Sequence, residues 1–588
     1  MKKVLAFLCI TSLFFCAADV TMVLAAPPFE NQCSDGTDND GDGLVDCDDS
    51  DCAADEACLI VVDPEICDDT IDNDGDGLTD CADPDCSADP ACAPGGGTHA
   101  DLLYQDYPNN CLGCHQVQFD EMAQAVHYRW LGEAPDMVTS PTAEQGKLTN
   151  AMNAYCINIT GDWAVCGKCH AGRGLRPDDP QADLTNIDCL MCHSEEYALT
   201  RTRLADGSMG SPAPTDTMVR NIHVPKNTNC LKCHAYGGGA NGVKRGDVAW
   251  ELATNTDPHY DAHMNTAGAN VQCIDCHTWQ NHKVTGKGSD LRPTDLASEV
   301  QCVQCHIGMD SGSGHADLGR SVEPDRHVAR VACQSCHIPT YGKTATETHR
   351  IWMTHHDGSD PTTCSDAEPC PGHPDRVEAT DLKPTYRFWN RLSENYLLGD
   401  DISLMYSAEN GTYQTSVPQG NINDGKLYPF KYKTSEAFMT SADNRLIALD
   451  TYEYLVKSGN IYTSIEQGLV NMGYQATEPY ELITTDTYQL INHGVTPAAE
   501  IAACEQCHPS GNLDPSTDSE LDALGYRLKD TQAVVCGQCH REKSPKTHES
   551  MHGHVSNRGF DCSFCHTFTR PERTGLCMPG DPSCDPSM

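Results

Sequence analysis

Ten copies of the pattern Cys-x-x-Cys-His constrain this chain of 588 residues more than any other feature. In each copy the two thiols can bond to the vinyl groups of a porphyrin, and the next histidine can bind its iron. A zinc site does not need a histidine directly after every second cysteine, so the repetition favours c-type haem attachment. We therefore expect ten covalently bound haems. Their attachment residues are Cys111, Cys114, His115, Cys166, Cys169, His170, Cys189, Cys192, His193, Cys230, Cys233, His234, Cys273, Cys276, His277, Cys302, Cys305, His306, Cys333, Cys336, His337, Cys504, Cys507, His508, Cys536, Cys539, His540, Cys562, Cys565 and His566.

The first residues, MKKVLAFLCITSLFF, carry two lysines followed by an apolar run. This run is shorter than the roughly 20 apolar residues that a membrane-spanning helix needs. It is typical of a secretory signal peptide, which we expect to cover residues 1–25. No later segment is apolar enough to span a membrane. The sequence thus predicts an exported protein, in the periplasm or at the cell surface or outside the cell, where disulfides persist.

The formal net charge of −46 excludes two classes of partner. Nucleic acids and anionic membrane surfaces both repel a strongly negative protein. Aromatic residues make up only 6% of the chain, which is low for a large apolar core. Ten porphyrins would supply apolar surface of their own, so we expect the chain to fold around haems.

Residues 26–94 contain an acidic repeat, in which DNDGDGLVDCDDSDC recurs as DNDGDGLTDCADPDC. Carboxylates at loop positions 1, 3, 5, 9 and 12, with glycine at position 6, suit Ca²⁺. The alternative is a solvated acidic linker, but a linker does not need four cysteines in each repeat. The pattern resembles the calcium-binding repeats of thrombospondin type 3. The expected Ca²⁺ ligands are Asp38, Asp40, Asp42, Asp46, Asp49, Asp72, Asp74, Asp76, Asp80 and Asp83.

From residue 95 the chain divides by the spacing of its motifs. Seven motifs fall in residues 95–337, none in 338–503 and three in 504–588. Apolar residues at steps of three and four predict helices in two parts of the haem-free segment, YRFWNRLSENYLLGDDISLMY and TYEYLVKSGNIYTSIEQGLVNMGY. The expected fold is a multihaem cytochrome c, mostly α with irregular loops packed around haems, together with the small disulfide-rich calcium module.

Five cysteines of the mature chain lie outside the motifs and the repeats. Cys364 and Cys370 flank a short Pro-containing loop and are close enough in sequence to pair, and Cys577 and Cys584 can pair in the C-terminal tail. Cys156 is then left over. It is either a buried small apolar residue or a thiol with a function.

A series of segments extends beyond the motifs: AVHYRWLGE, NIDCLMCHSEEY, CLKCHAYGGGANGVKRGD, HVARVACQSCHIPTYG and INHGVTPAAEIAACEQCH. In their residues and their order they resemble the octahaem tetrathionate reductase family. The resemblance covers about residues 99–528 and the first eight motifs. The acidic repeats and the last two motifs lie outside it.

The resemblance implies a reactive haem at the second motif, bound by His170. In the family a lysine is the other axial ligand of this haem, and Lys244 matches its position. A family cysteine near the haem is matched by Cys156, while Asn241 stands where the family has an acidic residue. A lysine must lose its proton to bind iron, which costs about 4–5 kcal/mol at neutral pH, so substrate can displace it more readily than histidine. Lys244, Cys156, His170 and Asn241 are therefore the candidate catalytic residues.

The other haems need a second axial ligand of their own. A second histidine makes a haem a low-spin electron carrier, whereas an iron that does chemistry needs a displaceable ligand. Sixteen histidines lie outside the motifs, enough for ten irons. We assign His99, His127, His263, His282, His315, His327 and His493 to the family haems, and His548, His552 and His554 to the two additional ones.

Two functions fit this sequence. In the first, the chain reduces a small sulfur or nitrogen oxyanion of the tetrathionate, nitrite or hydroxylamine class at the lysine-ligated haem. In the second, it is a non-catalytic electron conduit in which all haems have two histidine ligands. Both require redox partner proteins, such as quinol-linked enzymes or other cytochromes. Only the first requires a small anionic substrate.

Overall fold

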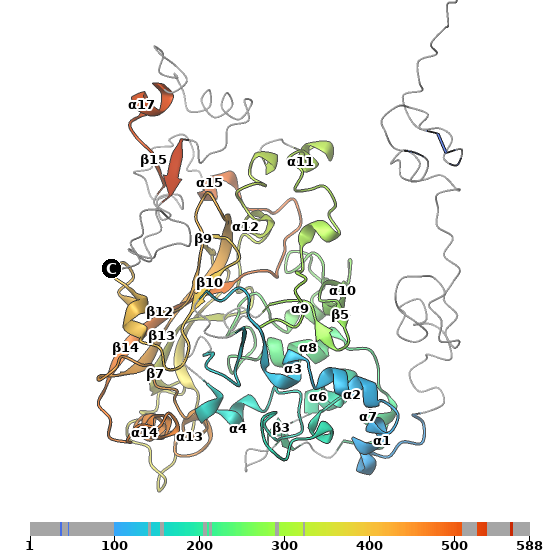
Figure 1. Cartoon of the computed structure of the whole chain (residues 1–588), viewed down its shortest axis with the longest axis vertical. Coiled ribbons are helices and arrows are strands. Elements are labelled where there is room, and N and C mark those ends of the chain that lie inside the picture. Colours follow the sequence, from blue (N-terminus) through green and yellow to red (C-terminus); the bar gives the residue numbers. More distant parts are fainter. Residues whose placement is uncertain are drawn as a thin grey trace, which may run out of the picture. The chain divides into compact units, whose positions relative to one another are not determined.

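In this computed structural model the chain divides into two compact units, residues 1–97 and 98–588 (Figure 1). The structure describes residues 34, 36, 37, 45, 99–138, 143–152, 158–200, 202–203, 209–210, 214–287, 293–320, 324–507, 526–537 and 565–568. The predicted signal peptide and all ten predicted Ca²⁺ ligands lie outside these residues. Among the described residues, none of the helices combines the length and the apolar character needed to cross a membrane. The account below concerns the second unit.

Short helices and irregular loops make up residues 99–337, as the close spacing of the motifs predicts. Most helices are a single turn, and many of them begin or end within a motif. Three two-stranded ladders join the loops: β1 (Leu131–Glu133) with β2 (Glu144–Gly146), β3 (Thr202–Arg203) with β4 (Met209–Gly210), and β5 (Trp279–Gln280) with β6 (Lys283–Val284). The helices are η5 (Tyr104–Asp106), α1 (Asn109–Leu112), α2 (Gln116–Met122), α3 (Val126–Arg129), η6 (Ile159–Gly161), α4 (Trp163–Cys166), η7 (Leu184–Asn186), α5 (Leu190–His193), α6 (Glu195–Thr200), α7 (Asp216–Arg220), α8 (Asn227–His234), α9 (Glu251–Thr254), α10 (Cys273–Cys276), η8 (Cys302–Gln304), α11 (Gly314–Asp317), η9 (Pro324–Arg326) and α12 (Cys333–His337).

An eight-stranded sheet dominates the haem-free segment. Its main path runs β10-β12-β14-β13-β7-β8, while β11 pairs with β12 and β9 with β13. The long central strand β13 is antiparallel to β14, in register from Phe430 opposite Leu490 to Thr440 opposite Tyr480. The strands are β7 (Thr346–His355), β8 (Pro374–Ala379), β9 (Thr385–Trp389), β10 (Ser393–Asn395), β11 (Tyr406–Ser407), β12 (Thr412–Pro418), β13 (Lys426–Thr440) and β14 (Tyr480–Leu490); the segment also contains η10 (Ile402–Met405).

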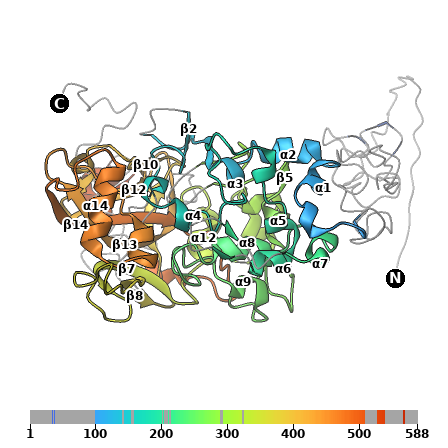
Figure 2. The ribbon, with the colours of Figure 1, turned by 90° about the horizontal axis from the view of Figure 1, so that it is seen from below.

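Two helices, α13 (Thr451–Val456) and α14 (Ile461–Asn471), pack against this sheet (Figure 2). Asp450 caps the first and Asn460 the second, each by accepting a hydrogen bond from a backbone N–H of the first turn. Their apolar faces join strand residues in one buried cluster: Trp352, Phe438, Ile447, Leu449, Tyr454, Ile461, Ile465 and Leu469. This cluster is the core of the haem-free segment on that side of the sheet.

The helix predicted for residues 386–406 is wrong, whereas helices are confirmed within residues 451–474. Tyr386 and Phe388 are both buried and pair with β13, so their period is two rather than three or four. A short apolar run fits the period of a helix or that of a strand. Here pairing with β13 makes the segment a strand. The expected fold class is therefore corrected: the chain is mixed helix and sheet, not mostly α.

The predicted pairing of Cys364 with Cys370 is confirmed, in the loop between β7 and β8. Cys577 and Cys584 lie outside the described residues. In the C-terminal part the structure describes α15 (Cys504–Cys507), β15 (Tyr526–Leu528), α17 (Gln532–Gly537) and β16 (His566–Phe568). The strands β15 and β16 pair antiparallel, which brings the last motif beside residues 526–528.

Candidate haem-ligand and electron-transfer site

The motifs share one backbone turn. In the first, third, fifth and sixth motifs the histidine N–H donates to the carbonyl oxygen of the first cysteine, over 2.8–3.0 Å. Such a turn closes the five-residue motif and holds its two thiols and its imidazole close together. The attachment chemistry therefore depends on local backbone structure, and the rest of the fold must supply the second axial ligand.

Five motif histidines face a second imidazole that comes from a distant part of the chain. An iron–imidazole bond is about 2 Å long, so two rings on opposite sides of one iron have centroids about 6 Å apart. The five observed separations match this distance, so the residues fit a c-type haem held by two histidines. The pairs are His99–His115 at 6.1 Å, His127–His234 at 6.2 Å, His193–His282 at 6.5 Å, His263–His306 at 6.0 Å and His277–His493 at 6.1 Å.

Hydrogen bonds at Nδ1 orient several of these rings. A proton on Nδ1 that is donated to an oxygen leaves Nε2 as the nitrogen available to iron. Five histidines show this arrangement with a carbonyl or carboxylate oxygen: His193 with His223 at 2.9 Å, His277 with Thr285 at 2.8 Å, His282 with Glu121 at 2.8 Å, His315 with Asp325 at 2.8 Å and His493 with Asp247 at 3.1 Å.

Asp247 is the most heavily used of these acceptors. Its side chain is fully buried and forms an ion pair with Arg245 at 2.9 Å. The same carboxylate accepts hydrogen bonds from the backbone N–H groups of Asn492 and His493. Burial alone would raise the pKa of Asp247, but Arg245 and His493 hold it well below its usual range. The carboxylate is therefore charged when it orients His493.

For the remaining predicted haem ligands the structure gives fewer contacts or none, because several lie outside the described residues. Burial lowers the pKa of His337 in the seventh motif, and the charge of His315 is the next largest cause, so these two imidazoles are neighbours. The carbonyl oxygen of His327 accepts backbone hydrogen bonds from Arg330 and Val331. The other predicted haem residues of the C-terminal part lie outside the described residues: His508, Cys539, His540, His548, His552, His554 and Cys562.

Neighbouring motifs contact one another directly. The thiols of Cys230 and Cys273, which open the fourth and fifth motifs, are hydrogen-bonded to each other. The thiols of Cys302 and Cys333 connect the sixth and seventh motifs in the same way. Asn229, just before the fourth motif, donates to the carbonyl oxygen of Met191 within the third, at 3.3 Å. Haems on these motifs would follow one another closely, as electron transfer requires.

The second motif has different surroundings. The imidazole of His170 is fully buried among the rings of Tyr128, Trp130 and Trp163, with centroids 5.0–5.3 Å away. Its Nε2 lies 2.6 Å from the carbonyl oxygen of Tyr128. Binding of iron through Nε2 would replace this hydrogen bond. A Cβ atom on Gly172 would lie 2.5 Å from the ring, so glycine is needed there.

The backbone around Lys244 is fixed to the sheet. The side chain of Lys431, on β13, is fully buried and its Nζ donates to the carbonyl oxygens of Val243 and Lys244, at 2.9 and 2.8 Å. It also donates to Oγ1 of Thr346, which in turn donates to the carbonyl oxygens of Gly242 and Val243. Two strands, β7 and β13, thus hold the candidate ligand by its main chain.

Asn241 uses both ends of its side-chain amide within this loop. Its Nδ2 donates to both carboxylate oxygens of Glu251, at 3.0 and 2.8 Å, and its Oδ1 accepts from the backbone N–H of Trp250 at 2.7 Å. Thr344 donates to the same carboxylate at 2.9 Å. These contacts close residues 241–251 into a compact loop and hold the Glu251 carboxylate against the side chain of Asn241.

His373 connects this loop with the second motif. A Cβ atom on Gly239 would lie 3.0 Å from the His373 ring, so the two are in contact. Burial lowers the pKa of His373, and the positive charge of Lys168, between the two cysteines of the second motif, also contributes. His373 therefore contacts Gly239 and senses the charge of the second motif. Cys156 lies outside the described residues.

A buried group of charges adjoins the loop. Lys433 on β13 pairs with Glu347 on β7 at 2.5 Å, and the same carboxylate binds Arg350 at 2.6 Å. Burial raises the pKa of Glu347, but the charges of Lys433 and Arg350 outweigh burial and bring this pKa down to about 2. Burial lowers the pKa of Lys433 to about 8, and the positive charge of Lys244 is a further cause. Lys431 is also fully buried, and burial together with the charge of Lys433 lowers its pKa well below the usual range.

Sequence reasoning missed several of these residues. Asp247 and Glu121 hold ligand histidines from positions far away in the chain, which no spacing rule predicts, and Asp325 holds His315 from 10 residues away. Lys431 and Lys433 did leave a signal: two lysines two residues apart in an apolar segment lie on one face of a strand. That signal becomes visible only when the segment is interpreted as a strand.

Comparisons with known proteins point to the same kind of site. A family model described as "Cytochrome c bacterial" matches residues 375–511, and one described as "Cytochrome c554 and c-prime" matches residues 278–338. An uncharacterized protein of Archaeoglobus fulgidus is 25% identical over 226 residues, 29% of this chain and 73% of that protein. The crystal structure of octaheme cytochrome c from Shewanella oneidensis is similar with a TM-score of 0.59 and 26% identity, over 77% of this chain and 100% of that chain. These matches and the imidazole pairs agree on covalently bound c-type haems.

Replacement of Asp247 by asparagine tests the role of this carboxylate. The change keeps an oxygen near Nδ1 of His493 but removes the charge, so we expect ligation by His493 to weaken by about 10–100-fold. In the electron paramagnetic resonance spectrum of the ferric protein, one low-spin signal should give way to a high-spin signal. Asp366→Asn, at an exposed carboxylate, is the control. Identical spectra for Asp247→Asn and the control would refute the assigned role.

Proposed function

Since this chain is a multihaem c-type cytochrome, we propose that it passes electrons along haems with two histidine ligands to a reactive haem at the second motif. One observation carries the proposal. Five motif histidines face a second imidazole at the distance that an iron requires, whereas His170 is enclosed by three aromatic rings. This division between paired motifs and the second motif is what the resemblance to the octahaem tetrathionate reductase family implies.

A haem at the second motif supplies an iron that can accept electrons and polarise an S–S or N–O bond. Cys166 and Cys169 would attach the porphyrin, His170 would bind its iron, and Lys244 would be a displaceable second ligand. A lysine binds iron only as the neutral amine. Cys156 would complete the site.

The charges at this place favour an anionic substrate. Two cations, Lys433 and Arg350, share the single carboxylate of Glu347 within a chain whose net charge is −46. Such a local excess of positive charge attracts small anions that the remaining surface repels. The substrate class is therefore a small oxidised sulfur or nitrogen compound, of the tetrathionate, nitrite or hydroxylamine kind.

Asn241 then acts by position rather than by proton transfer. Both polar ends of its amide are hydrogen-bonded within the loop, and an amide cannot deliver a proton. The acid that its Nδ2 contacts is Glu251. Asn241 holds that carboxylate beside the segment that carries Lys244. Any proton delivered from this side would come from Glu251 and not from the amide.

The second candidate function is a non-catalytic conduit in which every haem has two histidines. Contacts join the third motif with the fourth, the fourth with the fifth and the sixth with the seventh. They favour a conduit, because haems on these motifs would lie close to one another. Its partners would be redox proteins at both ends, quinol-linked enzymes or other cytochromes. The ligand of the second haem separates the two functions, since a conduit has no need for lysine at that iron.

The remaining elements of the proposal concern the N-terminal repeats and the location of the protein. We propose that residues 26–94 bind Ca²⁺ through the two sets of five aspartates, that residues 1–25 direct export, and that the mature protein works in the periplasm or outside the cell. Carboxylates at this spacing support Ca²⁺. Twenty cysteines committed to haem, and further cysteines that can pair, support an oxidising compartment.

Replacement of Lys244 by methionine tests the reactive haem. We expect the wild-type ferric spectrum to contain one low-spin signal distinct from those of bis-histidine haems, and the variant to lose it. With a reduced dye as electron donor, reduction of tetrathionate, nitrite or hydroxylamine should fall at least about ten-fold. Lys457→Met, at an exposed lysine of the α13 C-terminal cap, is the control. A wild-type spectrum with bis-histidine haems alone, unchanged in Lys244→Met, would leave the conduit as the function.

Replacement of Asn241 by aspartate tests the loop. The new carboxylate keeps the hydrogen bond from Trp250 but loses both bonds to Glu251 and repels it, so we expect about 2 kcal/mol less stability at pH 7. Repulsion raises the pKa of one carboxylate of the pair, and the loss should therefore shrink as the pH falls below about 5. Guanidinium unfolding at pH 7 and at a pH below about 5 measures this loss of stability.

The matched control for this loop is Asn390→Asp. Asn390 likewise donates to a carboxylate, Asp424, and accepts a backbone N–H through its Oδ1, but its site is solvent-exposed. Repulsion at an exposed site costs well under about 1 kcal/mol. Equal losses in the two variants, or a loss in Asn241→Asp that does not depend on pH, would contradict the structural role of Asn241.

Removal of Ca²⁺ tests the acidic repeats. Without the ion, ten aspartates at close spacing repel one another, so chelation should make residues 27–98 sensitive to protease. The haem spectra should persist, because the motifs begin at Cys111. Limited proteolysis with and without chelator, followed by peptide mass spectrometry, locates the cleavage. Resistance that chelation leaves unchanged would count against Ca²⁺ binding.

A further inference from the structure

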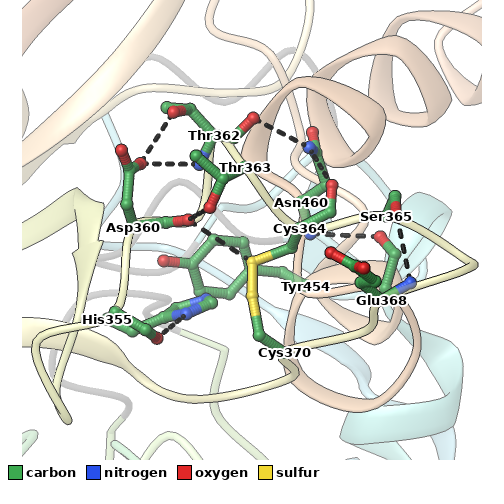
Figure 3. Close-up of a disulfide and its surroundings, with 12 residues drawn as sticks. His355, Asp360, Thr362, Thr363, Cys364, Ser365, Glu368, Cys370, Tyr454 and Asn460 are labelled. Atoms are coloured by element: carbon green, nitrogen blue, oxygen red, sulfur yellow. Dashed lines mark hydrogen bonds between the residues drawn. A yellow bond between two sulfur atoms is a disulfide. The ribbon is translucent and has the colours of Figure 1, made fainter.

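A second group of potential ligands surrounds the disulfide between Cys364 and Cys370 (Figure 3). It lies in the loop that joins β7 to β8. The two cysteines are six residues apart, and their Cα atoms are 5.6 Å apart. His355, the last residue of β7, contributes one imidazole nitrogen that lies within 4.8 Å of both sulfur atoms. Two sulfurs and one imidazole thus share a small volume.

The imidazole of His355 is held in place from several sides. Only 1% of the residue is exposed. Its Nδ1 hydrogen-bonds to Oγ of Ser359 at 2.9 Å, and the ring packs edge-on against that of Tyr454, with centroids 4.8 Å apart. Its Nε2 is buried as well. The ring is therefore fixed by its surroundings before any metal ion binds.

The donor set, one imidazole and two sulfur atoms, suits a transition-metal ion. Neutral imidazole and thiolate are the two side chains that zinc prefers.

The two cysteines keep their places independently of the S–S bond. The carbonyl oxygen of Cys364 accepts a hydrogen bond from Asn460 Nδ2 at 2.7 Å, and the backbone N–H of Cys370 donates to Ser458 at 2.9 Å. Gly459, between these two partners, has φ +78°, and a Cβ atom there would lie 2.3 Å from the Cys370 carbonyl oxygen. Reduction would therefore separate the sulfurs without releasing the backbone that carries them.

We propose that reduction of the Cys364–Cys370 disulfide opens a zinc site formed by Cys364, Cys370 and His355. Zinc–sulfur bonds of about 2.3 Å and zinc–nitrogen bonds of about 2.0 Å place the three ligand atoms roughly 3.5–4 Å from one another, within the observed spread. Three protein ligands leave a fourth position for water. The carbonyl oxygen of Asp360, 3.4 Å from Cys364 Sγ, can accept the S–H of the reduced, metal-free form.

The chemistry balances with a dithiol as reductant. The S–S bond takes two electrons and two protons, giving two thiols, and the dithiol is oxidised to its own disulfide. Zinc then displaces the two thiol protons and binds both thiolates. Oxidation would reverse the sequence and expel the metal. The site therefore exists in the reduced protein alone.

Zinc binding to the full-length haem-loaded chain tests the proposal. The protein is treated with a dithiol under argon, dialysed against Zn²⁺ in buffer containing Ca²⁺, and its zinc content is measured by mass spectrometry. We expect the reduced wild type to hold one zinc ion more than the reduced Cys364→Ser/Cys370→Ser double variant. Without reduction, the two proteins should hold equal amounts. His355→Gln, which loses one ligand, should weaken the site by at least about ten-fold.

A second measurement needs no substitution and so does not depend on the folding of a variant. Alkylation of the reduced wild type with iodoacetamide, followed by peptide mass spectrometry, reports each cysteine separately. Zinc should slow the alkylation of Cys364 and Cys370 together by at least about ten-fold, because a bound thiolate is a poorer nucleophile. Equal zinc contents in the reduced wild type and double variant, or alkylation rates at these two cysteines that zinc leaves unchanged, would overturn the proposal.

Discussion

The distance between two imidazole rings across one iron governs this structure. A motif fixes its own histidine within five residues, but the second histidine must be brought to about 6 Å from it by the remainder of the fold. His277 and His493 show how far this requirement reaches, because the latter directly follows β14 and its Nδ1 is held by Asp247. One ligand pair thus joins the motif-bearing region to the sheet. Apolar contacts act beside this pair, because Ala332, just before the seventh motif, packs in one buried cluster with Trp389, Phe430 and Tyr488 of the sheet.

The sheet contributes to the candidate site through buried charge. Placing Lys431 and Lys433 in the interior costs free energy that only good hydrogen bonds and a partner charge can offset. Both conditions hold: Lys431 donates to three oxygens, and Lys433 pairs with Glu347. Two of the three acceptors of Lys431 belong to the backbone of residues 243–244. The energetic requirement of a buried lysine therefore becomes a restraint on the loop that carries Lys244.

The motifs made haem attachment and the short helices of residues 99–337 predictable, since ten repetitions of one chemistry leave few alternatives. The haem-free segment was harder. Its helices at residues 451–474 follow from periodicity, whereas the strand containing Tyr386 and Phe388 depends on β13, which lies far along the chain. The hydrogen-bond acceptors of the ligand histidines could not be predicted from the sequence for the same reason. Asp247 and Glu121 act across more than a hundred residues, and no local pattern encodes such a contact.

The hairpin of β7 and β8 brings the two candidate sites into one structural element. Near its start, β7 binds the Lys244 loop through Thr346 and Glu347, and at its end it carries His355 beside the disulfide. The chain returns from Cys370 to His373 within three residues, and the ring of His373 packs against Gly239 of that same loop. A hydrogen bond from the backbone N–H of Cys370 to the carbonyl oxygen of Ser458 restricts the backbone just before His373. The hairpin therefore positions both the ligand atoms around Cys370 and the imidazole that contacts Gly239.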